Sequence, residues 1–190
     1  MEMNEKSNRI LDVAKARFER FGVKKTTMDE IAKDAGISKK TVYEHFRSKE
    51  DLFNSVFIRE ALKSKALALE RLAEVEDPLE QIEQVLRLAV DYHWRDSFMI
   101  QVLRDADGLY TPYLDDQYRL QVEDAVLNMI SSILQEGVER GRIREMDTRA
   151  VAYFFFKLFQ SFTFAKTASL KGDAKDLEEL VNFIMRGISK

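Results

Sequence analysis

The chain of 190 residues contains no cysteine and only two prolines. The lack of cysteine excludes disulfide bonds, thiolate metal sites and cysteine nucleophiles. Both prolines follow a residue that can cap a helix, in Asp77-Pro78 and Thr111-Pro112, so each pair predicts a helix start. No alternation of strand type persists anywhere in the sequence. These features predict an all-α protein of about nine helices.

Long apolar runs are also missing. Residues 1–6 contain no apolar run of the signal-peptide type, so no signal peptide is expected. The most apolar segment, residues 150–165, is interrupted by polar side chains and is too short for a membrane span. From these absences we expect a cytoplasmic protein that does not contact a membrane.

The small net charge of −3 argues against a nucleic-acid binder, but the charge is spread unevenly. Residues 1–50 hold twelve Lys or Arg and nine Asp or Glu, a balance of +3, and the other residues hold eighteen and twenty-four, a balance of −6. The electropositive part is therefore N-terminal, as contact with DNA at that end requires.

The stretch 26–52 predicts two short helices joined by a tight turn, followed by the start of a third helix. Ala32 is small enough to let the second helix approach the first. Gly36 permits the positive φ that a tight turn needs. Val42 lies on the inner face of the second helix. This joint spacing is typical of a helix-turn-helix, which places its second helix in the DNA major groove.

Capping signals support both helices. Thr27 and Glu30 form a capping box, Ser38 can cap the second helix, and Ser48 can cap the next one. That helix, residues 39–46, would read DNA, and Lys49 at the next helix start could bind a phosphate. Solvated helix faces are the alternative interpretation of these polar residues. The candidate DNA-binding residues are Thr27, Ser38, Lys39, Lys40, Thr41, Tyr43, His45 and Lys49.

A longer pattern surrounds the motif over residues 8–55. It is carried by Ile10–Ala14, Phe18, Phe21–Val23, Thr26–Ala32, Ala35–Ser38, Val42–Phe46 and Ser48–Leu52. With this pattern, residues 8–55 resemble the N-terminal domain of the tetracycline-repressor (TetR) family. The resemblance implies a transcriptional regulator, most often a repressor, that binds double-stranded DNA as a homodimer and responds to a small effector. It covers about a quarter of the chain and implies little about the remainder.

Two domains are expected: a DNA-binding domain over residues 4–64, with its motif at about 27–46, and a helical ligand-binding and dimerisation domain over residues 65–190. No Gly-, Pro- or Ser-rich linker separates them, because one long helix over residues 49–73 connects both. The other expected helices cover residues 4–21, 78–95, 97–106, 112–140, 148–168 and 173–189.

Aromatic residues gather in the second domain, where they could line a pocket for an apolar or aromatic effector. Core packing is the equally weighted alternative for this group. The candidate pocket residues are Tyr92, His93, Trp94, Phe98, Gln101, Tyr113, Phe155 and Phe159.

The helix at 148–168 is apolar on nearly every face, so one face is expected to pack on a second chain. Together with the last helix it would form a four-helix bundle in a dimer. The candidate interface residues are Phe156, Phe159, Leu177, Leu180, Val181, Ile184 and Ile188.

No phosphate loop, metal cluster or catalytic triad stands out, so neither enzyme activity nor a cofactor is expected. Adjacent carboxylates such as Asp115 and Asp116 point about 100° apart on a helix. The competing class is an all-α carrier of hydrophobic ligands, or an interaction protein, that retains the motif.

Overall fold

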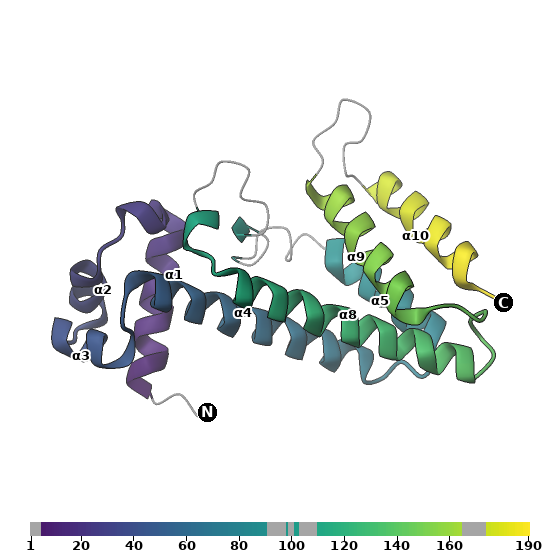
Figure 1. The fold of residues 1–190 in the computed structure, drawn as a ribbon, viewed down its shortest axis with the longest axis horizontal. Helices are drawn as coiled ribbons and strands as arrows, with labels where there is room; N and C mark the ends of the chain where they lie inside the picture. Colours follow the sequence, from purple (N-terminus) through teal and green to yellow (C-terminus); the bar gives the residue numbers. More distant parts are fainter. Residues whose placement is uncertain (1–4, 91–97, 99–100, 103–109, 165–173) are drawn as a thin grey trace. The chain divides into compact units, whose positions relative to one another are not determined.

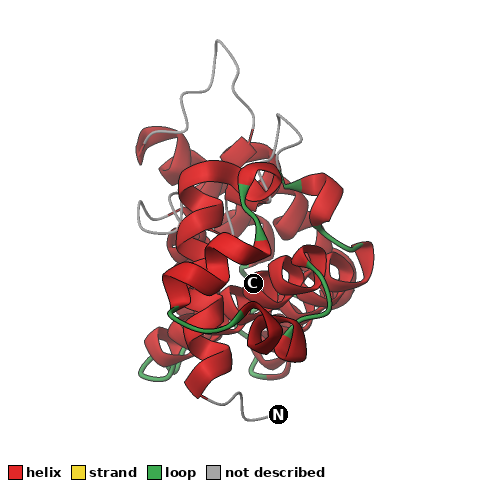
Figure 2. Ribbon diagram, turned by 90° about the vertical axis from the view of Figure 1, so that its left-hand side faces the viewer, coloured by secondary structure: helices red, strands yellow, loops and turns green. Residues whose placement is uncertain are grey.

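The computed structural model describes residues 5–90, 98, 101–102, 110–164 and 174–190. Helices dominate these residues, and their only bridge of strand type joins Ile143 and Ser189 (Figures 1 and 2). None of the described helices is long and apolar enough to span a bilayer. The described elements are α1 (Glu5–Lys25), α2 (Met28–Ala35), α3 (Lys39–His45), α4 (Lys49–Leu72), α5 (Pro78–Val90), the 3-10 turn η1 (Thr111–Tyr113), α8 (Asp116–Glu139), α9 (Thr148–Phe164) and α10 (Ala174–Ile188).

The all-α prediction is confirmed, with eight α-helices among the described residues. The chain divides into two compact units. Unit 1 contains residues 1–63 and 97–120, and unit 2 contains residues 64–96 and 121–190. Sequence reasoning had assigned the described residues of 98–120 to the second domain, whereas the structure groups them with the N-terminal helices.

The core of unit 1 forms around the apolar stripe predicted for α1. Ile10, Leu11, Ala14 and Phe18 are fully buried there. From α4, Phe53 meets Phe18 edge to face, with ring centroids 5.6 Å apart. Gly22 breaks the helical geometry of α1 with φ 76° and ψ 159°, so the helix that starts at Glu5 is interrupted where the sequence predicted its end, and a further short stretch runs to Lys25. α1 and α4 thus form the base on which the two short helices rest.

Charged side chains also join α1 to α4. The guanidinium of Arg59, on α4, lies 2.8 Å from a carboxylate oxygen of Asp12 and donates to the carbonyl of Asn8. Lys15 Nζ lies 2.8 Å from Glu60 Oε2. Arg59 is only 8% exposed, so its pairing with Asp12 is needed to offset the cost of burying a charge.

The expected single helix over residues 112–140 is wrong at its start. Thr111 to Tyr113 forms a 3-10 turn, and α8 begins only at Asp116. The side chain of Asn54, buried in α4, accepts a hydrogen bond from Asp115 N and donates to Tyr113 O. These bonds hold the backbone in a turn that local helical preference alone would not produce.

The hydrophobic core of unit 2 is built from α5, α9, α10 and the part of α8 that belongs to this unit, from residue 121 onward. The expected cap at Asp77-Pro78 is present, since Leu79 N donates to Asp77 Oδ1 at 2.9 Å. α10 packs on α5, and this contact buries the apolar stripe of α10 inside the chain. Val181, Ile184 and Ile188, predicted as interface residues, are therefore core residues with at most 3% exposure. Phe155, predicted to line a pocket, lies in the same core.

Gly36→Ala is expected to lower the free energy of unfolding by roughly 1–2 kcal/mol, because Gly36 has φ 64° and L-residues are strained in that region. Gly36→Asn should cost less, since asparagine tolerates this conformation. Urea unfolding measures both changes. Equal stability of Gly36→Ala and the native chain would contradict the proposed need for glycine.

Candidate nucleic-acid interface

The bend between α2 and α3 has the geometry that the spacing predicted. Gly36 is left-handed, and its N–H donates to Lys33 O at 3.1 Å. Ile37 N donates to Ala32 O at 3.0 Å, which completes a helix-ending motif that uses carbonyls otherwise unpaired. Ala32 and Val42 are buried, so the two helices meet through small and β-branched side chains.

Hydroxyl side chains start both helices. Thr27 Oγ1 accepts from Glu30 N at 3.3 Å, and Glu30 Oε2 accepts from Thr27 N at 2.9 Å, so the capping box is complete. The Thr27 hydroxyl also donates to Glu30 Oε2 at 2.8 Å, and this bond, the one from Thr27 N and the nearby Arg17 lower the pKa of Glu30. Ser38 Oγ accepts from Thr41 N at 3.1 Å and contacts Thr41 Oγ1 at 2.9 Å. Thr27, Ser38 and Thr41 therefore fix the helix ends, and Thr27 and Ser38 remain exposed to solvent.

One face of α3 is open to solvent. Lys39, Lys40 and Glu44 are exposed, and Tyr43 is 45% exposed. The opposite face is buried through Val42, with Phe46 directly after the helix. His45 is half-buried and its ring lies 6.3 Å from that of Phe46. The inward and outward faces are thus those expected of a reading helix.

The exposed lysines of α3 have acidic neighbours. Lys39 Nζ lies 2.7 Å from Asp29 Oδ1 on α2, and this hydrogen bond raises the pKa of Lys39. Lys40 Nζ lies 3.8 Å from Glu44 Oε1, one turn further along α3. Sequence reasoning did not single out Asp29, because a contact between residues ten apart depends on the angle at which α2 and α3 meet.

Lys49 has a different role from the phosphate contact predicted for it. Its ammonium donates to Val23 O at 2.8 Å and to Thr26 O at 3.1 Å, and it lies 5.4 Å from the centre of the Tyr113 ring. These partners occupy the ammonium inside unit 1. Lys49 is therefore better described as a clamp on the segment that enters α2 than as a DNA contact.

The start of α4 is likewise already capped by its own residues. Asp51 N donates to Ser48 Oγ at 3.1 Å, as expected for a cap, and Asp51 Oδ2 accepts from Arg47 N at 2.8 Å. A carboxylate at this helix start repels a phosphate. The proposed contacts with DNA consequently concentrate on α3.

Five of the eight predicted pocket residues lie among the described residues, and they fall in both units. Tyr92, His93 and Trp94 lie outside the described residues. In unit 1, the rings of Phe98 and Tyr113 pack against Phe53, at 5.9 and 6.4 Å between centroids, and Gln101 is half-buried. In unit 2, Phe155 is in the core and Phe159 is half-buried.

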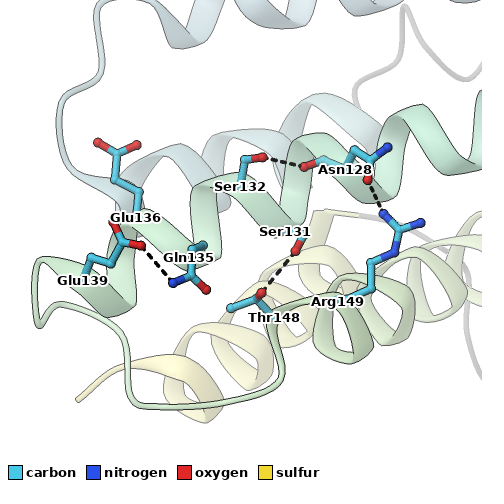
Figure 3. A pocket seen from close by; sticks show the side chains of 8 residues that line it. All are labelled: Asn128, Ser131, Ser132, Gln135, Glu136, Glu139, Thr148 and Arg149. Atoms are coloured by element: carbon cyan, nitrogen blue, oxygen red, sulfur yellow. Dashed lines mark hydrogen bonds between the residues drawn. The ribbon is translucent and has the colours of Figure 1, made fainter.

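An open groove of about 610 Å³ lies between α8 and the start of α9 in unit 2 (Figure 3). Ser131 Oγ donates across it to Thr148 Oγ1 at 3.1 Å, and Arg149 bonds Asn128. None of the predicted pocket residues lines this groove. Its polar lining consists of Asn128, Ser131, Ser132, Gln135, Glu136, Glu139, Thr148 and Arg149.

Comparison with known proteins gives a consistent result. Residues 10–56 match the model of bacterial regulatory proteins of the tetR family. The HTH-type transcriptional regulator YhgD of Bacillus subtilis is 27% identical over 155 residues, which cover 82% of this chain and 81% of that protein. The fold is shared with the fatty acid degradation regulator FadR of Bacillus halodurans, at 21% identity and a TM-score of 0.73, over 98% of this chain and 95% of that one. It is also shared with a Saccharomonospora viridis protein solved in complex with choline, at 20% identity and a TM-score of 0.77, over 99% and 100% of the two chains.

The open α3 face, its capped helix-turn-helix and these relatives together define a class: the chain is a DNA-binding transcriptional regulator of the helix-turn-helix type. Its residues 10–56 match the tetR family of bacterial regulatory proteins, so the chain is similar to that family over its helix-turn-helix.

Proposed function

We propose that this regulator is a repressor that binds a roughly palindromic operator as a homodimer and leaves it when a small effector binds. The observation that carries the DNA contact is the exposed face of α3, with Lys39, Lys40 and Tyr43 outward and Val42 buried. Lysine suits phosphates or guanine, and the Tyr43 ring with its hydroxyl suits the DNA backbone. Two such helices related by a two-fold axis would enter successive major grooves.

Lys40→Ala is expected to weaken binding to a duplex selected from random DNA, because its exposed ammonium is placed to contact phosphate. The loss should be about threefold to tenfold, with a salt slope smaller by about one ion per chain. Band-shift titrations over a range of KCl concentrations measure both quantities. Lys65→Ala, which removes an exposed lysine of α4 outside the motif, is the matched control. Equal behaviour of the two variants would remove Lys40 from the interface.

The dimer is proposed to form through the outer faces of α9 and α10 in unit 2. Phe154 on α9 is 58% exposed and Phe183 on α10 is 69% exposed. Both helices pack against α5, and their outer faces carry further exposed apolar side chains at Tyr153 and Leu158. Bulky apolar side chains gathered on a surface mark an interaction site. These residues replace Val181, Ile184 and Ile188, whose side chains face the core of their own chain.

Phe183→Glu and Phe154→Glu are expected to convert a dimer into a monomer at micromolar concentration, because a carboxylate cannot be buried unpaired in an apolar interface. Light scattering after size-exclusion chromatography measures the mass. Leu120→Glu, at a residue of unit 1 that is 54% exposed, should leave the dimer intact. A native chain that is already a monomer would overturn the proposed assembly.

For an effector to release DNA, its binding must change the position of α2 and α3. Contacts within unit 1 link the start of α2 to the turn before α8 and could transmit such a change. Asn54 holds the backbone of Tyr113 and Asp115, directly before α8. One turn earlier on α4, Lys49 lies over the Tyr113 ring and holds the carbonyls of Val23 and Thr26. Thr26 directly precedes the cap of α2 at Thr27, and Val23 lies four residues before that cap. We propose that a small apolar or aromatic effector acts on the reading helix by shifting this turn.

Asn54→Ala is expected to speed hydrogen exchange at the Asp115 amide and to weaken binding to the selected duplex about threefold to tenfold, since α2 loses a support that fixes its start. Mass spectrometry after deuterium labelling and band-shift titration measure the two effects. Ser55→Ala is the control, because the Ser55 hydroxyl donates only within α4, to Asp51 O at 2.8 Å. Faster exchange with unchanged DNA affinity would show that the turn is not coupled to DNA binding.

A further inference from the structure

The three carboxylates of α2 have different partners. Glu30 and Asp34 both pair with Arg17 of α1, on the side of α2 that faces the base of unit 1. Asp29 instead pairs with Lys39, the first residue of α3. It is therefore the α2 carboxylate that bonds a side chain of the reading helix.

The pair between Asp29 and Lys39 lies on the open surface next to Tyr43. The side chains of Asp29 and Lys39 are 64% and 58% exposed, and Lys39 Nζ lies 6.0 Å from the centre of the Tyr43 ring. The Lys39 side chain is thus drawn toward α2 across the face that would meet DNA. Its ammonium is already paired with a carboxylate in the protein without DNA.

This arrangement has a direct consequence for binding to DNA. A lysine contributes to sequence-independent affinity by displacing counterions from phosphates, and an ammonium held by a carboxylate does not displace them. An exposed ion pair is weak, so a better placed acceptor can open it. Guanine offers such an acceptor, because its O6 and N7 together bind a lysine ammonium in the major groove.

We propose that Asp29 is a specificity-determining residue, which keeps Lys39 away from the phosphates of DNA that lacks a suitable base and releases it to a guanine in the operator. The inference rests on the proposed role of α3 as the reading helix. Asp29 raises selectivity by lowering affinity for unrelated sequences, without touching DNA itself.

Asp29→Asn in the full chain provides the test, with two probes: a duplex selected from random DNA by the native protein, and a duplex of the same composition in shuffled order. Affinity for the shuffled duplex should rise about threefold to tenfold, with a salt slope steeper by about one ion per chain, because Lys39 now reaches phosphate. The ratio of the two affinities should fall by about threefold or more.

Two controls separate this effect from a general change of charge. Asp34→Asn removes the same charge from the same helix but frees Arg17 rather than Lys39, so it should leave the selectivity ratio unchanged. In a Lys39→Ala background, Asp29→Asn should have no effect on the shuffled duplex. Thermal unfolding of each variant checks that the fold is retained.

Three results would overturn the inference. The first is an equal gain in affinity for the shuffled duplex from Asp34→Asn. The second is a gain from Asp29→Asn that persists in the Lys39→Ala background. The third is that Asp29→Asn loses affinity for the selected duplex alone, which would mean that Asp29 itself contacts a base. A native chain that binds neither duplex would remove the DNA-reading role of α3 along with the inference. That failure is distinct, since it is seen before any variant is compared.

Discussion

The left-handed turn at Gly36 is the constraint on which the DNA-binding unit depends. It ends α2, directs the chain into α3 within three residues, and allows Ala32 and Val42 to be buried against each other's helices. Burial of Val42 then decides which face of α3 is open. Because successive side chains on a helix are about 100° apart, one buried position leaves Lys40 and Tyr43 on the outside. The surface proposed to meet DNA is a consequence of this turn.

Electrostatic pairing refines that surface. The lysines of the motif are not equivalent in their surroundings. Lys49 donates to backbone carbonyls inside unit 1, Lys39 pairs with Asp29 at 2.7 Å, and Lys40 pairs with Glu44 at 3.8 Å. A regulator needs modest affinity for unrelated DNA, and partly neutralised cations provide it. This fits the small excess of positive charge in the first fifty residues.

Unit 2 shows how one apolar pattern can serve two purposes. The stripe of α10 that suggested an interface is buried against α5, while Phe183 on its other side is exposed. Likewise, Phe155 of α9 is buried and its neighbour Phe154 is exposed. Periodicity shows that a helix has an apolar face, but it does not show whether the partner is the same chain or another one. Burial distinguishes the two possibilities, and here it moves the proposed dimer contact to the outer faces.

The sequence by itself determined the features that arise within a few residues: the caps at Thr27, Ser38, Ser48 and Asp77, the turn at Gly36, the inward position of Val42 and the all-α class. Each depends on local backbone geometry, which neighbouring residue types specify. The tertiary structure alone decided the contacts between distant residues, among them Asn54 with Tyr113, Lys49 with Val23, and Asp29 with Lys39. It also moved the start of the helix expected at Pro112 to Asp116, because the buried side-chain amide of Asn54 holds the preceding backbone in a turn. Such contacts depend on how helices pack, and no short stretch of sequence encodes that.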